Sequence, residues 1–156
     1  MTVLQGPLGD RDRWSAVGEC PIEQTMALLG TKSAMLIMRE AYYGTTRFDD
    51  FCRRVGITRA AAAARLTELV QAGLLSRRAY REPGQRGRNE YVLTEAGLDF
   101  MPVVWAMFEW GRRHLPTRSR LRLAHHGCGE QATVQIRCAD GHLVPPGELA
   151  VRLAGE

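Results

Sequence analysis

The stretch GITRAAAAARLTELVQAGLLSRR, residues 56–78, decides the fold. Thr58 has a side chain that caps helices and Gly73 is a residue that ends them, so the sequence predicts a helix between the two. Leu66 and Leu69 give this helix a stripe that faces a core. Its five consecutive alanines favour the helix but have no side-chain reach. Small residues on the exposed side would let the helix backbone lie close to a broad partner surface.

The segments before and after this helix predict a further helix on its N-terminal side and a β-hairpin on its C-terminal side. Residues 46–55 have Phe48, Phe51 and Val55 at helical spacing and lead into the tight turn GIT. Downstream, residues 74–94 change to the period of strands, with the turn sequence PGQRG between them. A helix, a tight turn, a second helix and a hairpin make a winged helix-turn-helix, whose second helix enters the major groove of DNA.

Further helices flank this motif. CPIEQTMALLG and TKSAMLIMREAYYG each read as a helix, and Thr94 begins a long helix in which Pro102 predicts a kink or a restart. We therefore predict a mainly α fold with a small β-hairpin wing. The predicted organisation is a flexible N-terminal arm (1–19), a DNA-binding and dimerisation domain (20–116) and a small hairpin-like C-terminal extension (117–156).

Positive charge is concentrated around the same motif. The whole chain has a net charge of +4, carried almost entirely by arginine. Between Gly44 and Leu93 there are ten arginines and five acidic residues, so the rest of the chain is close to neutral. A local excess of this kind is typical of a protein that binds a polyanion. The alternative is a solvated basic face without a ligand.

The predicted DNA contacts come from the helix over 58–72 and the wing over 76–93. Arg59, in the first turn of the helix, is the predicted reader of guanine, and Thr58 is a predicted phosphate contact. The complete predicted set is Arg47, Thr58, Arg59, Ala60, Ala63, Arg65, Arg77, Arg78, Arg81, Arg86 and Arg88. The alternative is that the alanines serve only helix propensity.

Short motifs follow one another in a fixed order along residues 20–113. They are Cys20-Pro21, GTKS at 30–33, IMRE at 37–40, Gly44-x-x-Arg47-Phe48, GIT at 56–58, Arg65-Leu66-x-x-Leu69, Gly73-Leu74, Tyr91-x-Leu93-Thr94-x-x-Gly97 and Trp110-Gly111. With these motifs the chain resembles the HxlR family of winged helix-turn-helix transcription regulators, which is akin to the MarR group. The resemblance implies the fold and binding to a double-stranded DNA operator. Ser33 and Ala62 stand where the family usually has Trp and Leu, so we expect different local packing there, with room for a small molecule.

The resemblance also implies a homodimer that forms through terminal helices. Independently, the last helix is apolar on more than one side, which favours a second partner. The predicted dimer contacts are Leu98, Met101, Trp105, Phe108 and Leu115. The alternative is that this helix only covers the core of its own chain.

Histidine and cysteine recur in the C-terminal extension. The candidate zinc ligands are His125 or His126, Cys128, Cys138 and His142, which together could form a tetrahedral site. The extension lacks the paired C-x2-C knuckles of a zinc ribbon, and Asp140 stands where another thiolate could sit. The alternative is a small hairpin with packed cysteines, decayed from a zinc ribbon. We therefore expect that no cofactor is required.

Cys20 is the candidate sensor residue. It precedes Pro21 at a predicted helix start, where the helix dipole favours a thiolate. The resemblance adds that family members with a cysteine at this position can act as redox or electrophile sensors. The alternative is a plain cap residue in a regulator that senses something else. We interpret Cys52 as a packed residue.

Other functional classes fit the sequence less well. The histidines are confined to the last third, there is no glycine-rich phosphate loop, and the arginines are not paired with candidate catalytic acids, so an enzyme is not expected. A winged-helix module that binds only protein would not need a basic wing. No apolar run reaches the length of a membrane span, and the N-terminus does not read as a secretory signal, so we expect a cytoplasmic protein. Its expected effector is an oxidant or a small molecule.

Overall fold

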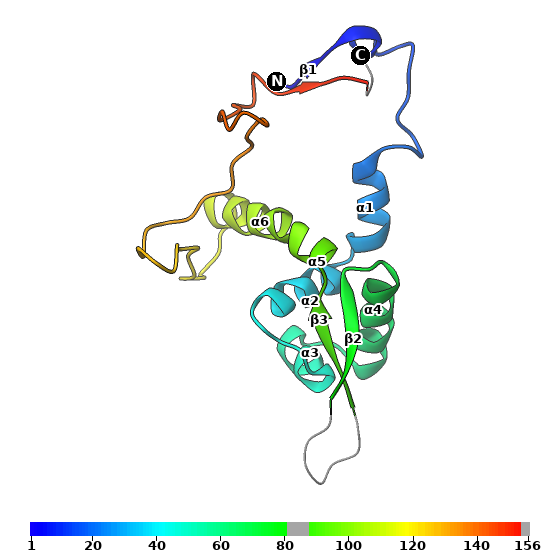
Figure 1. Ribbon diagram of the computed structural model, residues 1–156, viewed down its shortest axis with the longest axis vertical. Helices are drawn as coiled ribbons and strands as arrows, with labels where there is room; N and C mark the ends of the chain where they lie inside the picture. Colours follow the sequence, from blue (N-terminus) through cyan, green and yellow to red (C-terminus); the bar gives the residue numbers. More distant parts are fainter. Residues whose placement is uncertain (81–87, 154–156) are drawn as a thin grey trace. The chain divides into compact units, whose positions relative to one another are not determined.

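The computed structural model describes residues 1–80 and 88–153. The chain divides into two compact units (Figure 1). The larger unit is Pro21–Thr117, and the smaller one combines Met1–Cys20 with the chain from Arg118 onward. Among the described residues, no helix has the length and apolar character needed to cross a membrane.

The larger unit has the order of elements of a winged helix-turn-helix, which confirms the predicted fold class (Figure 1). Its elements are α1 (Pro21–Leu29), α2 (Lys32–Tyr42), α3 (Phe48–Val55), α4 (Arg59–Gln71), β2 (Leu75–Tyr80), β3 (Arg88–Leu93), α5 (Glu95–Asp99) and α6 (Met101–His114).

Threonine caps set where three of these helices begin. The hydroxyl of Thr31 accepts from the N–H of Ala34 at α2, and Thr94 does the same for Gly97 at α5. Thr58 accepts from the N–H of Ala61 at 3.2 Å and so begins α4 where the sequence predicts. A cap of this kind contributes about 1 kcal/mol.

The turn between α3 and α4 depends on Gly56. Its φ of 72° lies in the left-handed region, which favours glycine, and its N–H donates to the carbonyl of Cys52 at 3.0 Å. A residue with a side chain would be strained here. The turn therefore fixes the angle at which α4 leaves α3.

The core of the larger unit lies between α2, α3, α4 and the two strands. Its largest fully buried side chains are Ile37, Met38, Phe51, Leu66, Leu69 and Leu75. Burying such a side chain contributes about 1.5–3 kcal/mol. Leu66 and Leu69 lie on one face of α4 and are buried in this core. The opposite face of the helix is therefore exposed to solvent.

The two strands form an antiparallel hairpin that runs from the pair Leu75–Leu93 to the pair Tyr80–Arg88. A short stretch before α3 adds to its edge, since the N–H of Tyr91 donates to the carbonyl of Thr46 at 2.8 Å. The wing is thus joined to the helix-turn-helix by backbone hydrogen bonds.

The predicted long helix after Thr94 is divided in two. Helix α5 ends at Asp99 and α6 begins at Met101, with Pro102 in its first turn, which confirms the expected restart. The hydroxyl of Tyr42 on α2 donates to the carbonyl of Gly97 at 2.7 Å and ties α5 to the core.

The smaller unit brings the two ends of the chain together. Strand β1 (Val3–Leu4) pairs in parallel with β4 (Ala150–Val151). A short 3-10 helix, η1 (Gly6–Gly9), follows β1, and the indole N–H of Trp14 donates to the carbonyl of Leu8 at 2.8 Å. This differs from the sequence-based expectation of an N-terminal arm separate from the C-terminal extension.

The hairpin expected in the C-terminal extension does not form among the residues that the structure describes. Residues 130–137 alternate in polarity, but in the structure they take part only in two isolated bridges, Ala124–Gln131 and Arg137–Leu143. Each bridge closes a short turn of its own. The extension therefore contains two small turns where we expected a hairpin.

Candidate nucleic-acid interface

The outer face of α4 is made of small or polar side chains. Thr58, Arg59, Ala60 and Ala63 are exposed, together with Ala61 and Ala64. Ala62, by contrast, is fully buried, one helical turn before Leu66. The residues predicted to face DNA and those predicted to face the core are thus on opposite sides of the helix.

Arg59 is already engaged in the free chain. Its guanidinium forms an ion pair with Asp49 of α3 and lies 4.9 Å from the ring centre of Phe48. Both charged side chains are well exposed, at 72% and 64%. The Arg59 guanidinium therefore already has an acidic partner within the chain.

Arg65 has a different environment. It forms an ion pair with Glu68 one helical turn later, at 2.5 Å, and its side chain is only 29% exposed. Arg53 of α3 pairs in the same way with Asp50, and the hydrogen bond from Arg53 lowers the pKa of that carboxyl. Both pairs follow the i,i+3 spacing of a helix.

The arginines of β2 are exposed but partnered. Arg77 donates to the hydroxyl of Thr67 on α4 at 3.1 Å. Arg78 forms an ion pair at 2.7 Å with Glu90 on β3, and its hydrogen bond lowers the pKa of the Glu90 carboxyl. These contacts link the two strands of the wing to each other and β2 to α4.

Arg47 lies half-buried at the start of α3. Its guanidinium stacks 3.5 Å from the ring centre of Tyr80 at the end of β2. Of the other predicted wing contacts, Arg81 and Arg86 lie outside the described residues, as does the side chain of Arg88, whose backbone pairs with Tyr80.

Among the described residues of this surface, four acids lie beside arginines and form ion pairs: Asp49 with Arg59, Asp50 with Arg53, Glu68 with Arg65 and Glu90 with Arg78. The sequence reasoning missed these pairs. The i,i+3 spacing could have predicted the two pairs within helices, and the strand register could have predicted the Arg78–Glu90 pair. The Arg59–Asp49 pair could not be predicted in this way, because it depends on the packing of α3 against α4.

The predicted dimer residues divide into two groups. Leu98, Met101 and Leu115 are exposed. Trp105 and Phe108 are half-buried, and Trp105 lies 5.7 Å from the ring centre of Tyr43.

Exposed apolar side chains that were not predicted as dimer contacts lie nearby on two helices. We call them the α1–α6 patch, defined as Ile22 and Met26 of α1 with Val103, Met107 and Trp110 of α6. Three of them, Met26, Val103 and Met107, also line one cavity.

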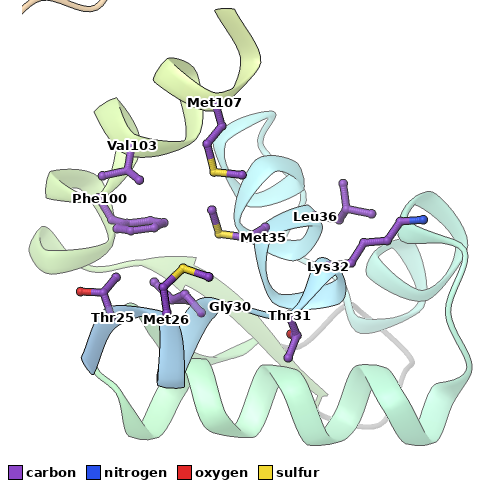
Figure 2. A pocket seen from close by; sticks show the side chains of 11 residues that line it. Thr25, Met26, Gly30, Thr31, Lys32, Met35, Leu36, Phe100, Val103 and Met107 are labelled. Atoms are coloured by element: carbon purple, nitrogen blue, oxygen red, sulfur yellow. The ribbon is translucent and has the colours of Figure 1, made fainter. Parts of the chain in front are cut away.

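A cavity of about 410 Å³ opens between α1, α2 and the start of α6 (Figure 2). Figure 2 shows Met26, Met35 and Met107 converging on it from these three helices, with Phe100 and Val103 on the α6 side. Neither Ser33 nor Ala62 lines this cavity. This cavity is therefore not at the positions where the two departures from the family pattern suggested room for a small molecule.

The four candidate zinc ligands do not come together. Ligand atoms of Cys138, Asp140 and His142 lie within 4.8 Å of one another. His125 and Cys128 form a separate pair, with 3.1 Å between the imidazole Nδ1 and the thiol Sγ. All four cysteines are free thiols, and Cys128 and Cys138 are exposed, so the expectation of packed cysteines in the extension was wrong.

The thiols of Cys20 and Cys52 are similar in burial. Cys20 is half-buried just before α1, and its backbone N–H donates to the carbonyl of Ala16 at 2.9 Å. Cys52 is also half-buried, in α3.

A helix-turn-helix followed by a hairpin, with arginines around an exposed recognition helix, defines the winged-helix class of DNA-binding proteins. The HxlR-like helix-turn-helix family model matches residues 28–119, and the chain belongs to that family of transcriptional regulators. The family and its relatives regulate transcription and are not enzymes, and the same holds for this chain.

Individual relatives agree with this assignment. The chain is 36% identical over 119 residues to an HTH-type transcriptional regulator of Mycobacterium bovis, an alignment that covers 75% of this chain and 74% of the relative. The crystal structure of PA1607, a proposed transcription factor, matches with a TM-score of 0.74 and 28% identity and covers 90% of this chain and 98% of that one. The redox regulator HypR in its reduced form matches with a TM-score of 0.56 and 31% identity over 62% of this chain and 95% of its own.

Proposed function

We propose that the chain is a dimeric, sequence-specific regulator that binds an inverted-repeat operator. Helix α4 enters the major groove of each half-site, and the β2–β3 wing contacts the neighbouring backbone. The observation that carries this proposal is the outer face of α4, where small side chains follow Thr58 and Arg59. Small side chains permit a close approach of the helix, and an alanine methyl packs on a thymine methyl.

We assign recognition of the base sequence to Arg59. Its fork matches the O6 and N7 acceptors of guanine, and its position in the first helical turn agrees with the docking of recognition helices. Thr58 and the N-terminal end of α4 bind a phosphate. In the complex, the guanidinium of Arg59 exchanges Asp49 for the base.

General affinity is assigned to the arginines outside that turn. Arg47 directly precedes α3, Arg65 lies on α4, and Arg77 and Arg78 lie on β2. Arg81, Arg86 and Arg88 are included from the sequence. Contacts of arginine with phosphate carry no sequence information but release counterions. Affinity is therefore expected to fall steeply with salt.

The dimer is assigned to the exposed apolar side chains of α5 and α6, together with the α1–α6 patch. A second copy of the chain would remove these side chains from water, which stabilises the assembly by about 25 cal/mol for each Å² of apolar area covered. Two-fold symmetry would then set two α4 helices one or two helical turns of DNA apart.

Met107→Glu places a charge in the patch and is expected to give monomers in sedimentation velocity. Leu121→Glu, at an exposed leucine of the smaller unit, is the matched control and should leave the dimer intact. Equal behaviour of the two variants would contradict the assignment.

The signal reaches the dimer through α1. Cys20 directly precedes this helix, and the similarity to HypR, which is named a redox regulator, supports an oxidant as effector. The apolar cavity beside α1 and α6 is within the size range of small-molecule sites, so a hydrophobic effector is the second candidate. Both act in the cytoplasm, where we place the protein.

A gel-shift assay with promoter DNA from beside the protein's own gene tests the proposal. We expect a shift that excess random DNA does not abolish at moderate salt. If no DNA is bound in preference to random DNA, the chain is instead a winged-helix module that binds protein.

A further inference from the structure

The segment Cys138–His142 forms a tight turn with three metal-ligating side chains. The N–H of Cys138 donates to the carbonyl of His142 at 3.0 Å, and the N–H of Gly141 donates back to the carbonyl of Cys138 at 2.9 Å. Gly141 has a φ of 81°, so glycine is favoured at this reversal. The turn brings ligand atoms of Cys138, Asp140 and His142 within 4.8 Å of one another.

The base of this turn is held by further backbone contacts. Arg137 and Leu143 form a bridge, and the N–H of Val144 donates to the carbonyl of Ile136 at 2.9 Å. The Arg137 guanidinium also donates to the carbonyl of Gly141 at 2.8 Å. Because these contacts fix the backbone, the three ligands do not depend on distant parts of the chain for their grouping.

These three side chains do not serve a hydrophobic core. All three are exposed, although cysteine is among the most often buried residue types. Neither the DNA-binding surface nor the proposed dimer uses them, since they belong to the smaller unit. Their grouping therefore needs another explanation.

A second turn in the same unit has a similar layout. The N–H of Gly129, with a φ of 78°, donates to the carbonyl of His125 at 2.8 Å, and the bridge Ala124–Gln131 closes the turn. Here too an imidazole and a thiol meet, at 3.1 Å between His125 and Cys128. In this second turn the contact joins two candidate ligands, whereas the first turn groups three.

We propose that the turn Cys138–His142 binds one Zn²⁺ through the Cys138 thiolate, an Asp140 carboxylate oxygen and an imidazole nitrogen of His142. The ligand chemistry favours zinc, because thiolate and imidazole are ligands of Zn²⁺, whereas Mg²⁺ and Ca²⁺ prefer oxygen alone. On binding, the thiol of Cys138 releases its proton to solvent and the sulfur donates its electron pair to the ion. Water completes the tetrahedron at the fourth position.

This ligand set differs from the one that the sequence spacing suggested. Asp140 enters it, while His125 and Cys128 remain on their own turn. The difference allows a direct test, because the proposed ligands Cys138 and His142 each have a residue of the same type in the smaller unit, Cys128 and His126, that is not a proposed ligand.

The test is a Zn²⁺ titration of the full-length protein, after removal of metal, in competition with a coloured chelator. We expect one Zn²⁺ per chain. Cys138→Ser and His142→Ala should each weaken binding by more than about tenfold, since even residues that only orient a ligand cost 10–100-fold. Cys128→Ser and His126→Ala, the matched controls, should change the affinity by less than about twofold, since neither removes a ligand.

The proposal is overturned if the wild-type protein binds no Zn²⁺, if Cys138→Ser binds as the wild type does, or if Cys128→Ser loses as much affinity as Cys138→Ser. Alkylation followed by mass spectrometry gives a second readout in the wild type, independent of variant folding. Zn²⁺ should slow the labelling of Cys138 and leave Cys128 unchanged, because a bound thiolate is no longer a free nucleophile.

Discussion

Arg59→Ala separates the specificity of DNA binding from its affinity. In the free chain the Arg59 guanidinium pairs with Asp49, and in the proposed complex it grips a guanine. The substitution removes both contacts. The ion pair exists only in the unbound protein, so it affects binding to operator and to random DNA equally.

The magnitudes follow from this distinction. A bidentate contact of arginine with guanine gives about 1–3 kcal/mol of discrimination, so the ratio of operator to random affinity should fall by roughly 5- to 150-fold. An exposed pair such as Arg59–Asp49 contributes about 0–1 kcal/mol. Asp49→Asn, which releases the guanidinium, should therefore tighten both kinds of DNA by up to about fivefold and leave their ratio nearly unchanged.

Fluorescence anisotropy with labelled operator and random duplexes at one fixed salt concentration measures both quantities. Asp50→Asn is the matched control for Asp49→Asn, because it removes the same charge from the next residue but releases Arg53 instead. In the Arg59→Ala background, Asp49→Asn should have no larger effect than Asp50→Asn.

Two results would refute this reasoning. If Arg59→Ala lowers operator and random affinity by the same factor, then Arg59 reads no base. If Asp49→Asn tightens binding no more than Asp50→Asn does, then the ion pair does not compete with DNA.

Three further predictions concern the wing, the thiols and the smaller unit. Arg86→Ala combined with Arg88→Ala should weaken operator and random DNA about equally and reduce the salt slope by roughly two, as measured by anisotropy over a salt series; a selective loss of operator binding would reverse the assigned roles. Cys20 should be alkylated faster than Cys52 in a mass-spectrometric time course, and an oxidant should weaken DNA binding in the wild type but not in Cys20→Ser. A truncated chain of residues Pro21–Thr117 should still shift operator DNA in a gel, and complete loss of binding would show that the smaller unit is needed.

The structural features that the sequence predicted best are those determined by residues close together in the sequence. The Thr58 cap and the break before Pro102 depend on side chains within one helical turn, so the boundaries of α4 and α6 could be predicted. Gly56 belongs with them, because a left-handed backbone conformation is a local property. The core stripe of α4 followed from its period, which placed Leu66 inside and Arg59 outside.

The features that sequence did not predict arise from contacts between distant residues. Asp49 and Arg59 are on different helices, and only the packing of α3 against α4 brings them together. The cavity depends in the same way on how α1 approaches α6. In the extension, spacing suggested that Cys128 and Cys138 shared one site, but spacing does not show that two separate turns intervene.

The parallel pairing of Val3–Leu4 with Ala150–Val151 can form only after nearly the whole chain has been synthesised. A ribosome that adds 5–20 residues each second leaves the first strand without its partner for on the order of ten seconds. The helix-turn-helix unit has received all of its residues once Thr117 has been made. A growing chain therefore carries a complete set of recognition elements before its two ends meet.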